Sequence, residues 1–407
     1  MAAATRTSIS MVAAGGMILA LGLGIRHGFG LFLPPMTAAH GWGREVFSLA
    51  LAVQNLTWGL SQPLFGMVAD RFGAGRVLLL GAVVYASGLA LMSSASSGLA
   101  LVLSVGLLVG LGLGATGFGV VYGAISRGVP AEQRSNALGL AGALGSVGQF
   151  TMMPVAQHLI ATIGWAATLV VLAATSALMA PLGLGLAARP RGSAGPIPAA
   201  PSLRGTLREA VHHRGFWLLN LGFVVCGFQL AFMTNHLPAF LADHGLEPRA
   251  AVTALAVIAA TNIFGTWLCG YLGGRFREKR LLAVLYLVRT LATVAYVGGD
   301  ITSTSTTAYA VAMGLTWLGT VPLTSGVLAR IFGVQYLATL FGFVFLGHQV
   351  GGFFGVWLAG ALFDATHSYQ AIWLISIALG IVSTIVHLPI DDRTLGVDRA
   401  ARQALRA

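Results

Sequence analysis

Charged side chains are scarce in this sequence. Lys and Arg number 23 and Asp and Glu number 12, so charged residues fill 9% of the 407 positions, whereas hydrophobic residues fill 56%. A soluble globular domain carries about 25% charged residues. This chain has too little polar surface to enclose a core of its size in water, which excludes an ordinary soluble enzyme, a disordered chain and a nucleic-acid-binding module.

Cysteine is equally rare, because Cys226 and Cys269 are the two in the chain and each lies inside an apolar run. They give neither a disulfide framework nor the spacing of a metal site. The sequence also has no phosphate-binding Gly-Lys loop, no Ser-centred nucleophile elbow and no His-Glu-x-x-His pattern. We therefore expect no catalytic residue, no metal, no cofactor and no ATP-driven pumping.

Long apolar segments are what the chain has instead. A bilayer core about 30 Å thick needs roughly 20 residues per helix, and the 55 glycines among Leu, Val and Ala favour closely packed membrane helices. The sequence predicts twelve spans, near residues 9–33, 46–69, 77–95, 99–125, 137–162, 165–187, 215–241, 250–273, 281–298, 306–329, 336–363 and 369–389.

The formal net charge of +11 reflects how basic residues are distributed across a membrane and does not indicate binding to a nucleic acid. With the N-terminus inside, 19 of the 23 Lys and Arg residues lie on the inner side, two lie outside (Arg44 and Arg249) and two lie within spans (Arg26 and Arg289). Such a bias indicates orientation. We expect both termini in the cytosol, a retained first helix rather than a signal peptide, and a multi-pass protein of the inner (plasma) membrane.

The chain divides into two similar halves. A polar, Pro- and Arg-rich stretch predicts a cytoplasmic linker at 189–214 between two six-helix bundles, 1–188 and 215–390, with a cytoplasmic tail at 391–407. A shift of 204 residues places Ala-Leu-Ala-Val at 50–53 on Ala-Leu-Ala-Val at 254–257. Repeated membrane bundles indicate alternating access around a site at their interface.

A glycine- and arginine-rich loop follows the second span. It reads Gly66-Met-Val-Ala-Asp70-Arg71-Phe-Gly73-Ala-Gly75-Arg76, and a weaker copy runs from Gly270 through Arg275 to Arg280. This resembles the loop signature of the major facilitator superfamily, which implies an all-α fold of twelve transmembrane helices and a gate at the cytosolic face. The copy has Gly274 where an Asp would stand, so we expect an asymmetric gate. The predicted gate residues are Gly66, Asp70, Arg71, Gly73, Arg76, Gly270, Arg275 and Arg280.

The polar side chains within the spans indicate the charge of the transported solute. All twelve acids lie at the inner side, the outer side or the outer helix ends, whereas Arg26, Arg289, His27, His236 and His348 lie near mid-membrane. An intramembrane arginine is costly and marks a functional site by default. Basic groups without a counter-carboxylate suit an anionic solute, which would complete the charge pairing.

Arg26 lies in a glycine-rich stretch, Gly22 to Gly30, that leaves room beside the first helix. This stretch resembles the first helix of the monocarboxylate-transporter and oxalate–formate-exchanger branch, where a basic residue can precede a Phe-rich end. The branch commonly has an Arg on the eighth helix where this sequence has Thr266, with Asn262 one turn earlier. The alternative is that Arg26 is structural and snorkels to the outer surface.

The histidines predict that transport is coupled to protons, because imidazole titrates near neutral pH. Arg26 disfavours a charged His27 until an anion arrives, which would link the two binding events; each histidine has the alternative of an ordinary hydrogen-bonding role. The predicted substrate-binding residues are Arg26, His27, Asn55, Tyr122, Gln149, His236, Asn262, His348 and Gln349.

The sequence thus predicts a secondary transporter of a small organic anion, a monocarboxylate in the first place, with protons as a possible co-substrate and the lipid bilayer as its surroundings. The alternative is an efflux carrier for a neutral or amphipathic compound. A membrane receptor or enzyme without transport has no sequence feature in its favour.

Overall fold

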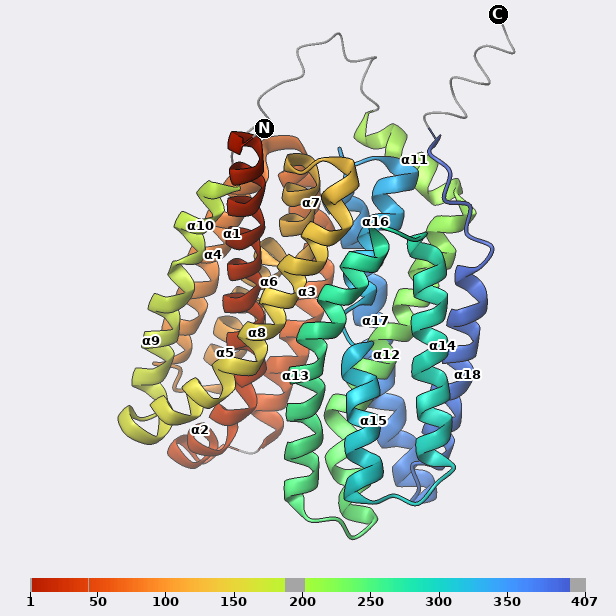
Figure 1. Cartoon of the computed structure of the whole chain (residues 1–407). Coiled ribbons are helices and arrows are strands. Elements are labelled where there is room, and N and C mark those ends of the chain that lie inside the picture. Colours follow the sequence, from red (N-terminus) through yellow and green to blue (C-terminus); the bar gives the residue numbers. More distant parts are fainter. Residues whose placement is uncertain (1, 43, 187–201, 396–407) are drawn as a thin grey trace, which may run out of the picture.

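The computed structural model describes residues 2–42, 44–186 and 202–395, and this part of the chain is helical without strands, which confirms the all-α prediction (Figure 1). The first half comprises α1 (Ala2–His27), η1 (Gly28–Phe32), α2 (Leu33–His40), α3 (Arg44–Phe72), α4 (Ala74–Met92), α5 (Gly98–Leu101), η2 (Val102–Val109), α6 (Gly110–Thr116), α7 (Phe118–Gly128), α8 (Ala131–Ile163), α9 (Trp165–Ala177) and α10 (Met179–Gly185). The second comprises α11 (Leu203–His212), α12 (Arg214–Asp243), α13 (Pro248–Gly273), α14 (Glu278–Val297), α15 (Ser303–Leu315), α16 (Thr320–Phe332), α17 (Leu337–Thr366) and α18 (Gln370–His387).

Eleven helical stretches among the described residues are long and apolar enough to cross a membrane. The 29-residue α3 covers the remaining predicted span but is not among those eleven. It carries Gln54, Asn55 and Gln62, the kind of polar side chains that face protein rather than lipid. Within the predicted linker the structure has α11 at its end, whereas 189–201 and 396–407 lie outside the described residues.

The two halves stand side by side, with α1 to α10 forming one and α12 to α18 the other (Figure 1). The same hydrogen bond recurs in both. The hydroxyl of Tyr85 on α4 donates to the Gly22 carbonyl on α1 at 2.9 Å, and the hydroxyl of Tyr286 on α14 donates to the Gly222 carbonyl on α12 at 2.7 Å. Each bond ties the third long helix of a half to its first, as expected for a duplicated unit.

The most extensive contacts between the halves are made by two helix pairs, α3 with α17 and α8 with α13. Glycines permit the close approach: a Cβ on Gly66 would lie 2.5 Å from the Ala338 carbonyl oxygen, and one on Gly139 would lie 2.5 Å from Gly270 Cα. Helices in lipid associate through such small residues, since the bilayer supplies no hydrophobic driving force between them. These contacts lie toward the end of the bundle where α1 begins and α18 ends, here termed the termini end (Figure 1).

The basic bias predicts that the termini end faces the cytosol. A Ser193→Cys variant in the linker should then resist an impermeant maleimide added to intact cells and react after permeabilisation. Thr304→Cys, at an exposed position between α14 and the body of α15 at the opposite end, should react without permeabilisation. The unsubstituted protein measures background from its two cysteines. Labelling of position 193 from outside, with protection of position 304, would reverse the orientation.

Candidate functional site

Two of the long helices are interrupted near the middle of the bundle. Gly117, extended at φ −79° and ψ −178°, separates α6 from α7, and residues 316–319 separate α15 from α16. Interruptions of this kind expose backbone groups at membrane depth, where they must find partners in protein or line a polar cavity. In transporter folds they mark the neighbourhood of the binding site.

Asn262 on α13 supplies one such partner. Its side-chain oxygen accepts from the Leu318 amide at 3.0 Å and from the Thr266 hydroxyl at 2.9 Å, and its amide donates to the Ser146 hydroxyl on α8 at 2.9 Å. Thr266, which stands where the resemblance implies an arginine, and Asn262 one turn earlier therefore secure the α15–α16 break and the α8–α13 contact.

Arg26 occupies the last turn of α1, where α1 gives way to η1. Its side chain is partly buried, donates to the Asn55 side-chain oxygen on α3 at 2.5 Å, and lies 4.9 Å over the Trp58 ring. Its Nε finds no acceptor among the described residues. Gly24 lets α1 approach Gly148 on α8, and a Cβ on Gly30 would meet nothing within 4 Å. Arg26 thus keeps one buried donor, its Nε, without a partner among the described residues.

Asn55 links Arg26 to the other half. Its backbone carbonyl accepts from the Gln349 side-chain amide on α17 at 3.1 Å, and the Gln349 oxygen lies 3.2 Å from His348 Nδ1. The His348 ring stacks on Phe345 with centroids 5.3 Å apart, and Phe345 lies 4.8 Å from Trp58, the ring beneath Arg26. Six side chains form a closed chain of contacts across the interface, here termed the bridging ring: Arg26, Asn55, Gln349, His348, Phe345 and Trp58.

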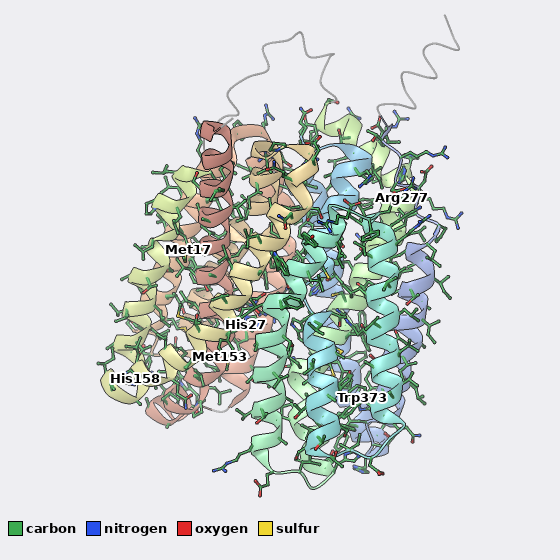
Figure 2. All side chains as sticks on the ribbon, in the orientation of Figure 1. Met17, His27, Met153, His158, Arg277 and Trp373 are labelled. Atoms are coloured by element: carbon green, nitrogen blue, oxygen red, sulfur yellow. The ribbon has the colours of Figure 1, made fainter. Side chains whose placement is uncertain are left out.

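His27 follows Arg26 and is exposed, although it lies about midway along the bundle (Figure 2). Its Nδ1 lies 2.8 Å from the Leu23 carbonyl oxygen and therefore donates a hydrogen bond to it. The other ring nitrogen, Nε2, takes no part in this bond. The structure therefore places a titratable group next to Arg26 without a charged partner of its own.

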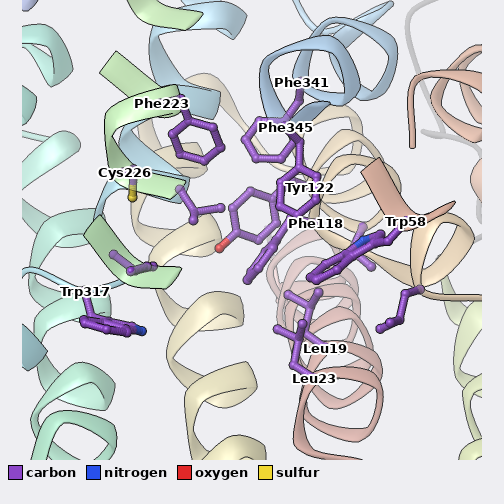
Figure 3. Packing of buried hydrophobic residues seen from close by; sticks show 14 of the residues in the cluster. Leu19, Leu23, Trp58, Phe118, Tyr122, Phe223, Cys226, Trp317, Phe341 and Phe345 are labelled. Atoms are coloured by element: carbon purple, nitrogen blue, oxygen red, sulfur yellow. The ribbon is translucent and has the colours of Figure 1, made fainter. Parts of the chain in front are cut away.

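Tyr122 and Gln149 are both buried. Figure 3 shows Tyr122 among Phe118, Phe341 and Phe345, with Phe223 and Cys226 to one side and Trp58 to the other. The Tyr122 hydroxyl has no hydrogen-bond partner among the described residues and lies where a Cβ on Gly142 would meet it. Tyr122 belongs to α7 and Gln149 to α8, and their role as lining groups stays a prediction.

His236 is placed differently from the other predicted site residues. Its Nε2 lies 3.1 Å from the Val356 carbonyl and its Nδ1 lies 3.3 Å from the Tyr369 hydroxyl. All its hydrogen-bond partners belong to the second half, and none belongs to the bridging ring. Its observed contacts secure α12 against α17 and the start of α18.

Arg289 on α14 is fully buried inside the second half. It donates to the carbonyls of Thr316 and Trp317 and, at 3.2 Å, to the Gln229 side-chain oxygen. Arg289 therefore satisfies free carbonyls of the α15–α16 break, and its side chain faces that helix interruption.

Trp58, Gln62 and Phe345 were not among the predicted site residues. Trp58 and Gln62 are buried one turn apart on α3, and neither the Trp58 indole nitrogen nor the Gln62 amide has a partner among the described residues. A signal was available for Gln62, since it continues the polar series of Gln54 and Asn55 along one helix. Trp58 and Phe345 are indistinguishable in the sequence from packing residues.

Asp70 forms the charged contact between the halves. Its carboxylate accepts from the Thr339 amide and the Thr339 hydroxyl, both at 2.8 Å, at the start of α17, and from Arg127 on α7 at 2.6 Å. A carboxylate at a helix N-terminus is favoured by the free amides and the dipole. The start of a helix is thus one of the groups that Asp70 contacts, and Arg127, rather than the neighbouring Arg71, is its charged partner.

The remaining loop residues are simpler. Gly73 has φ +96°, which favours glycine, and turns the chain between α3 and α4. In the weaker copy, Gly273 and Gly274 stand opposite the start of α8, and the buried Ser135 hydroxyl there has no partner among the described residues. One contact is thus charged and the other a Gly139–Gly270 approach. Four arginines of the motif are exposed, namely Arg71, Arg76, Arg275 and Arg280.

Comparison with known proteins agrees with this architecture. The family model for the Major Facilitator Superfamily matches residues 12–324. The chain belongs to the major facilitator superfamily. It is therefore a secondary transporter, not an enzyme, with a lipid bilayer around it and a small-molecule substrate.

Among its relatives, monocarboxylate transporter 11 of Homo sapiens is 29% identical over 93% of this chain and 82% of that protein. The MFS-type transporter YcxA of Bacillus subtilis (strain 168) is 26% identical over 91% and 92%. Among solved structures, the human organic anion transporter MFSD10 has a TM-score of 0.72 at 15% identity, covering 93% of this chain and 99% of that one. FucP in the outward conformation has a TM-score of 0.70 at 16% identity, covering 94% and 99%.

The Asp70 contacts predict a gating defect without loss of the binding site. Asp70→Asn removes the charge that three donors share, and a hydrogen bond to a charged group contributes about 1.5–3 kcal/mol. We expect transport into proteoliposomes to fall at least about tenfold, with substrate affinity largely unchanged.

The matched control is Asp300→Asn, an exposed position at the opposite end of the bundle, which should transport normally. If Asp70→Asn abolished equilibrium binding while the conformational cycle stayed normal, the assignment of Asp70 to the gate would be wrong.

Proposed function

We propose that this transporter moves a small organic anion, a monocarboxylate, by alternating access across the plasma membrane, and that Arg26 holds the carboxylate. The observation that carries the proposal is a mid-membrane guanidinium that is partly buried, has an Nε without a partner among the described residues, and hydrogen-bonds to a neutral amide. An arginine binds a carboxylate through charge-assisted and often bidentate bonds.

The distribution of ion pairs supports an anion. The five ion pairs among the described side chains join Asp70 to Arg127, Asp392 to Arg277 and to Lys279, Glu278 to Arg330, and Asp391 to Arg393. Neither Arg26 nor Arg289 takes part in them. Arg289 is compensated by backbone carbonyls, whereas Arg26 has one amide oxygen. A charge at membrane depth with so little compensation favours a binding partner of opposite sign.

His27 supports coupling to protons. An anion bound at Arg26 would lie next to the exposed imidazole and would favour its charged form by Coulomb attraction, so that a proton and an anion would bind together. The sequence relatives named monocarboxylate transporters are consistent with a carboxylate substrate.

The bridging ring supports alternating access through the same residues. Asn55 bonds Arg26 with its side chain and Gln349 of the other half with its backbone. A carboxylate that competes with Asn55 for Arg26 would alter an element that both halves share. Substrate binding and closure of the interface would thereby be linked without a second site.

The first test substitutes Arg26, the residue proposed to hold the carboxylate. Arg26→Ala should abolish anion binding, because removing one partner of such a pair costs about 2–5 kcal/mol, roughly thirtyfold or more in affinity. Arg26→Lys should retain part of the affinity, since its point charge lacks the planar fork. Both variants should fold, because each removes or conserves a charge rather than creating one.

Arg393→Ala, at a highly exposed side chain, is the control and should bind normally. Binding would be measured by titration calorimetry of purified protein against a panel of carboxylates. Near-unchanged affinity in Arg26→Ala would contradict the anion site and favour the alternative of a neutral or amphipathic efflux substrate.

A further inference from the structure

Arg289 carries a positive charge inside the second half, and no carboxylate among the described residues pairs with it. Its side chain is fully buried and takes no part in the five described ion pairs. The carbonyls of Thr316 and Trp317 and the side-chain oxygen of Gln229 accept its hydrogen bonds, but none of these oxygens carries a formal charge. Because a buried charge is ordinarily paired with one of opposite sign, a group that can become negative is expected beside it.

Two tyrosines approach this guanidinium, and each uses its proton in a hydrogen bond. The Tyr286 ring centre lies 5.4 Å from the guanidinium carbon, and the Tyr286 hydroxyl donates to the Gly222 carbonyl at 2.7 Å. The Tyr309 hydroxyl, which interacts electrostatically with the same arginine, donates to the Met233 sulfur at 3.6 Å. Both phenols therefore act as donors to neutral acceptors, and neither supplies the negative charge.

The thiol of Cys226 on α12 is the acidic group that receives donors. Arg289 Nη1 donates to the Cys226 sulfur at 3.8 Å, and the Thr320 hydroxyl oxygen lies 3.4 Å from the same sulfur. Cys226 is buried, whereas Cys269, the other cysteine, is partly exposed and makes no hydrogen bond among the described residues. An adjacent cation and hydrogen-bond donors stabilise a thiolate. Cys226 is thus placed to supply the counter-charge that Arg289 lacks.

Helix α17 brings a histidine to the same sulfur. The His348 side chain is a hydrogen-bond partner of Cys226, and a Cβ on Gly227, the next residue, would overlap the His348 carbonyl oxygen. Figure 3 shows the Cys226 sulfur near Phe223, whose ring lies 5.1 Å from that of His348. His348 is partly exposed and belongs to the bridging ring. It therefore connects a buried thiol with the contacts that lead to Arg26.

The surroundings of this thiol are basic or neutral. The titratable groups around Cys226 and Arg289 come from five helices: Cys269 on α13, Tyr286 on α14, Tyr309 on α15, His348 on α17 and His387 on α18. His387 stacks on Tyr286 with centroids 5.2 Å apart, and its Nδ1 lies 2.6 Å from the Ser383 carbonyl. No carboxylate is among these groups, so the nearby charges favour a negative sulfur.

We propose that Cys226 is a proton-exchange site: its ionised sulfur is the counter-charge of Arg289, and it takes up a proton from His348. In this transfer an N–H bond of the imidazolium breaks and an S–H bond forms, so that both groups become neutral and Arg289 loses its counter-charge. Water returns a proton to His348. The ionised thiol stands on the contacts described above, whereas its use in transport rests on the proposed proton-coupled movement of an anion.

The ultraviolet absorbance of the thiolate tests the ionised state on purified full-length protein, titrated below about pH 9 so that the tyrosines stay protonated. Only about a few per cent of an ordinary thiol is ionised at pH 7. We expect a thiolate signal at least about tenfold larger than that. Cys226→Ser, which keeps a small hydrogen-bonding group, should lose the signal, and the matched control Cys269→Ser should keep it.

A spectrum at neutral pH that Cys226→Ser leaves unchanged would overturn the proposal. If that variant fails to fold, Cys269→Ser still decides the outcome, because Cys226 is then the single cysteine of the chain. His348→Gln tests the proton transfer: the thiolate should persist beside Arg289, and its protonation after a pH jump should slow by at least about tenfold. Equally fast protonation without His348 would remove His348 from the proposal.

Titration calorimetry with lactate at several pH values tests the use of this site in transport. Lactate affinity should fall by up to about tenfold per pH unit as the pH rises through the ionisation of the thiol, because one proton binds together with the anion. Cys226→Ser should reduce this slope, and Cys269→Ser should leave it unchanged. An unchanged slope in Cys226→Ser would overturn the role in coupling. Failure of lactate to bind would contradict the proposed monocarboxylate transport, while the absorbance measurement decides the ionised thiol separately.

Discussion

The account depends on one charge: the guanidinium of Arg26, held at the middle of a membrane bundle by the neutral amide of Asn55. A charge in that position is tolerated only where protein or water compensates it. In the second half the corresponding problem is solved internally, because Arg289 donates to carbonyls freed by the α15–α16 break. Each arginine keeps an Nε without a partner among the described residues, but Arg26 has one neutral amide as its acceptor and is partly exposed, whereas Arg289 is fully buried among several acceptors. That difference is the physical basis for assigning the site.

The same residues also carry the contact between halves. Asn55 and Gln349 connect α3 to α17 at the level of Arg26, and Asp70 connects the same helices nearer the termini end. On the opposite side, α8 meets α13 through glycines and through the Ser146–Asn262 bond. Small-residue packing thus joins the halves on both sides, and the α3–α17 side adds the charged contact of Asp70. A charge-assisted contact can be broken and reformed with solvent, which suits a gate, whereas glycine contacts permit sliding.

The helices followed from the sequence because hydropathy and length are the constraints that a bilayer imposes most strongly. Each predicted span corresponds to one long helix or to a run of two to four shorter elements, and the superfamily assignment was confirmed. The interruptions at Gly117 and at 316–319 could not be located in advance, because glycine in this sequence serves close packing at many other positions.

The site was predictable to the extent that polar residues stand out against an apolar background. Arg26, Asn55, His348 and Gln349 come together in the bridging ring, although they come from three helices of both halves. Trp58 and Phe345 escaped notice because an aromatic residue in an apolar run has the same pattern whether it packs or binds. The separation of His236 from the ring depended on helix rotation, which periodicity does not fix when a helix is apolar on every side.

The most direct test of the central claim compares acids with their amides, which keep the shape and lose the charge. Purified protein would be titrated with the pairs acetate and acetamide, lactate and lactamide, and benzoate and benzamide. If Arg26 holds a carboxylate, at least one acid binds and its amide is weaker by roughly thirtyfold or more, the effect of removing one partner from a buried charge pair. An amide that binds as tightly as its acid would contradict the account.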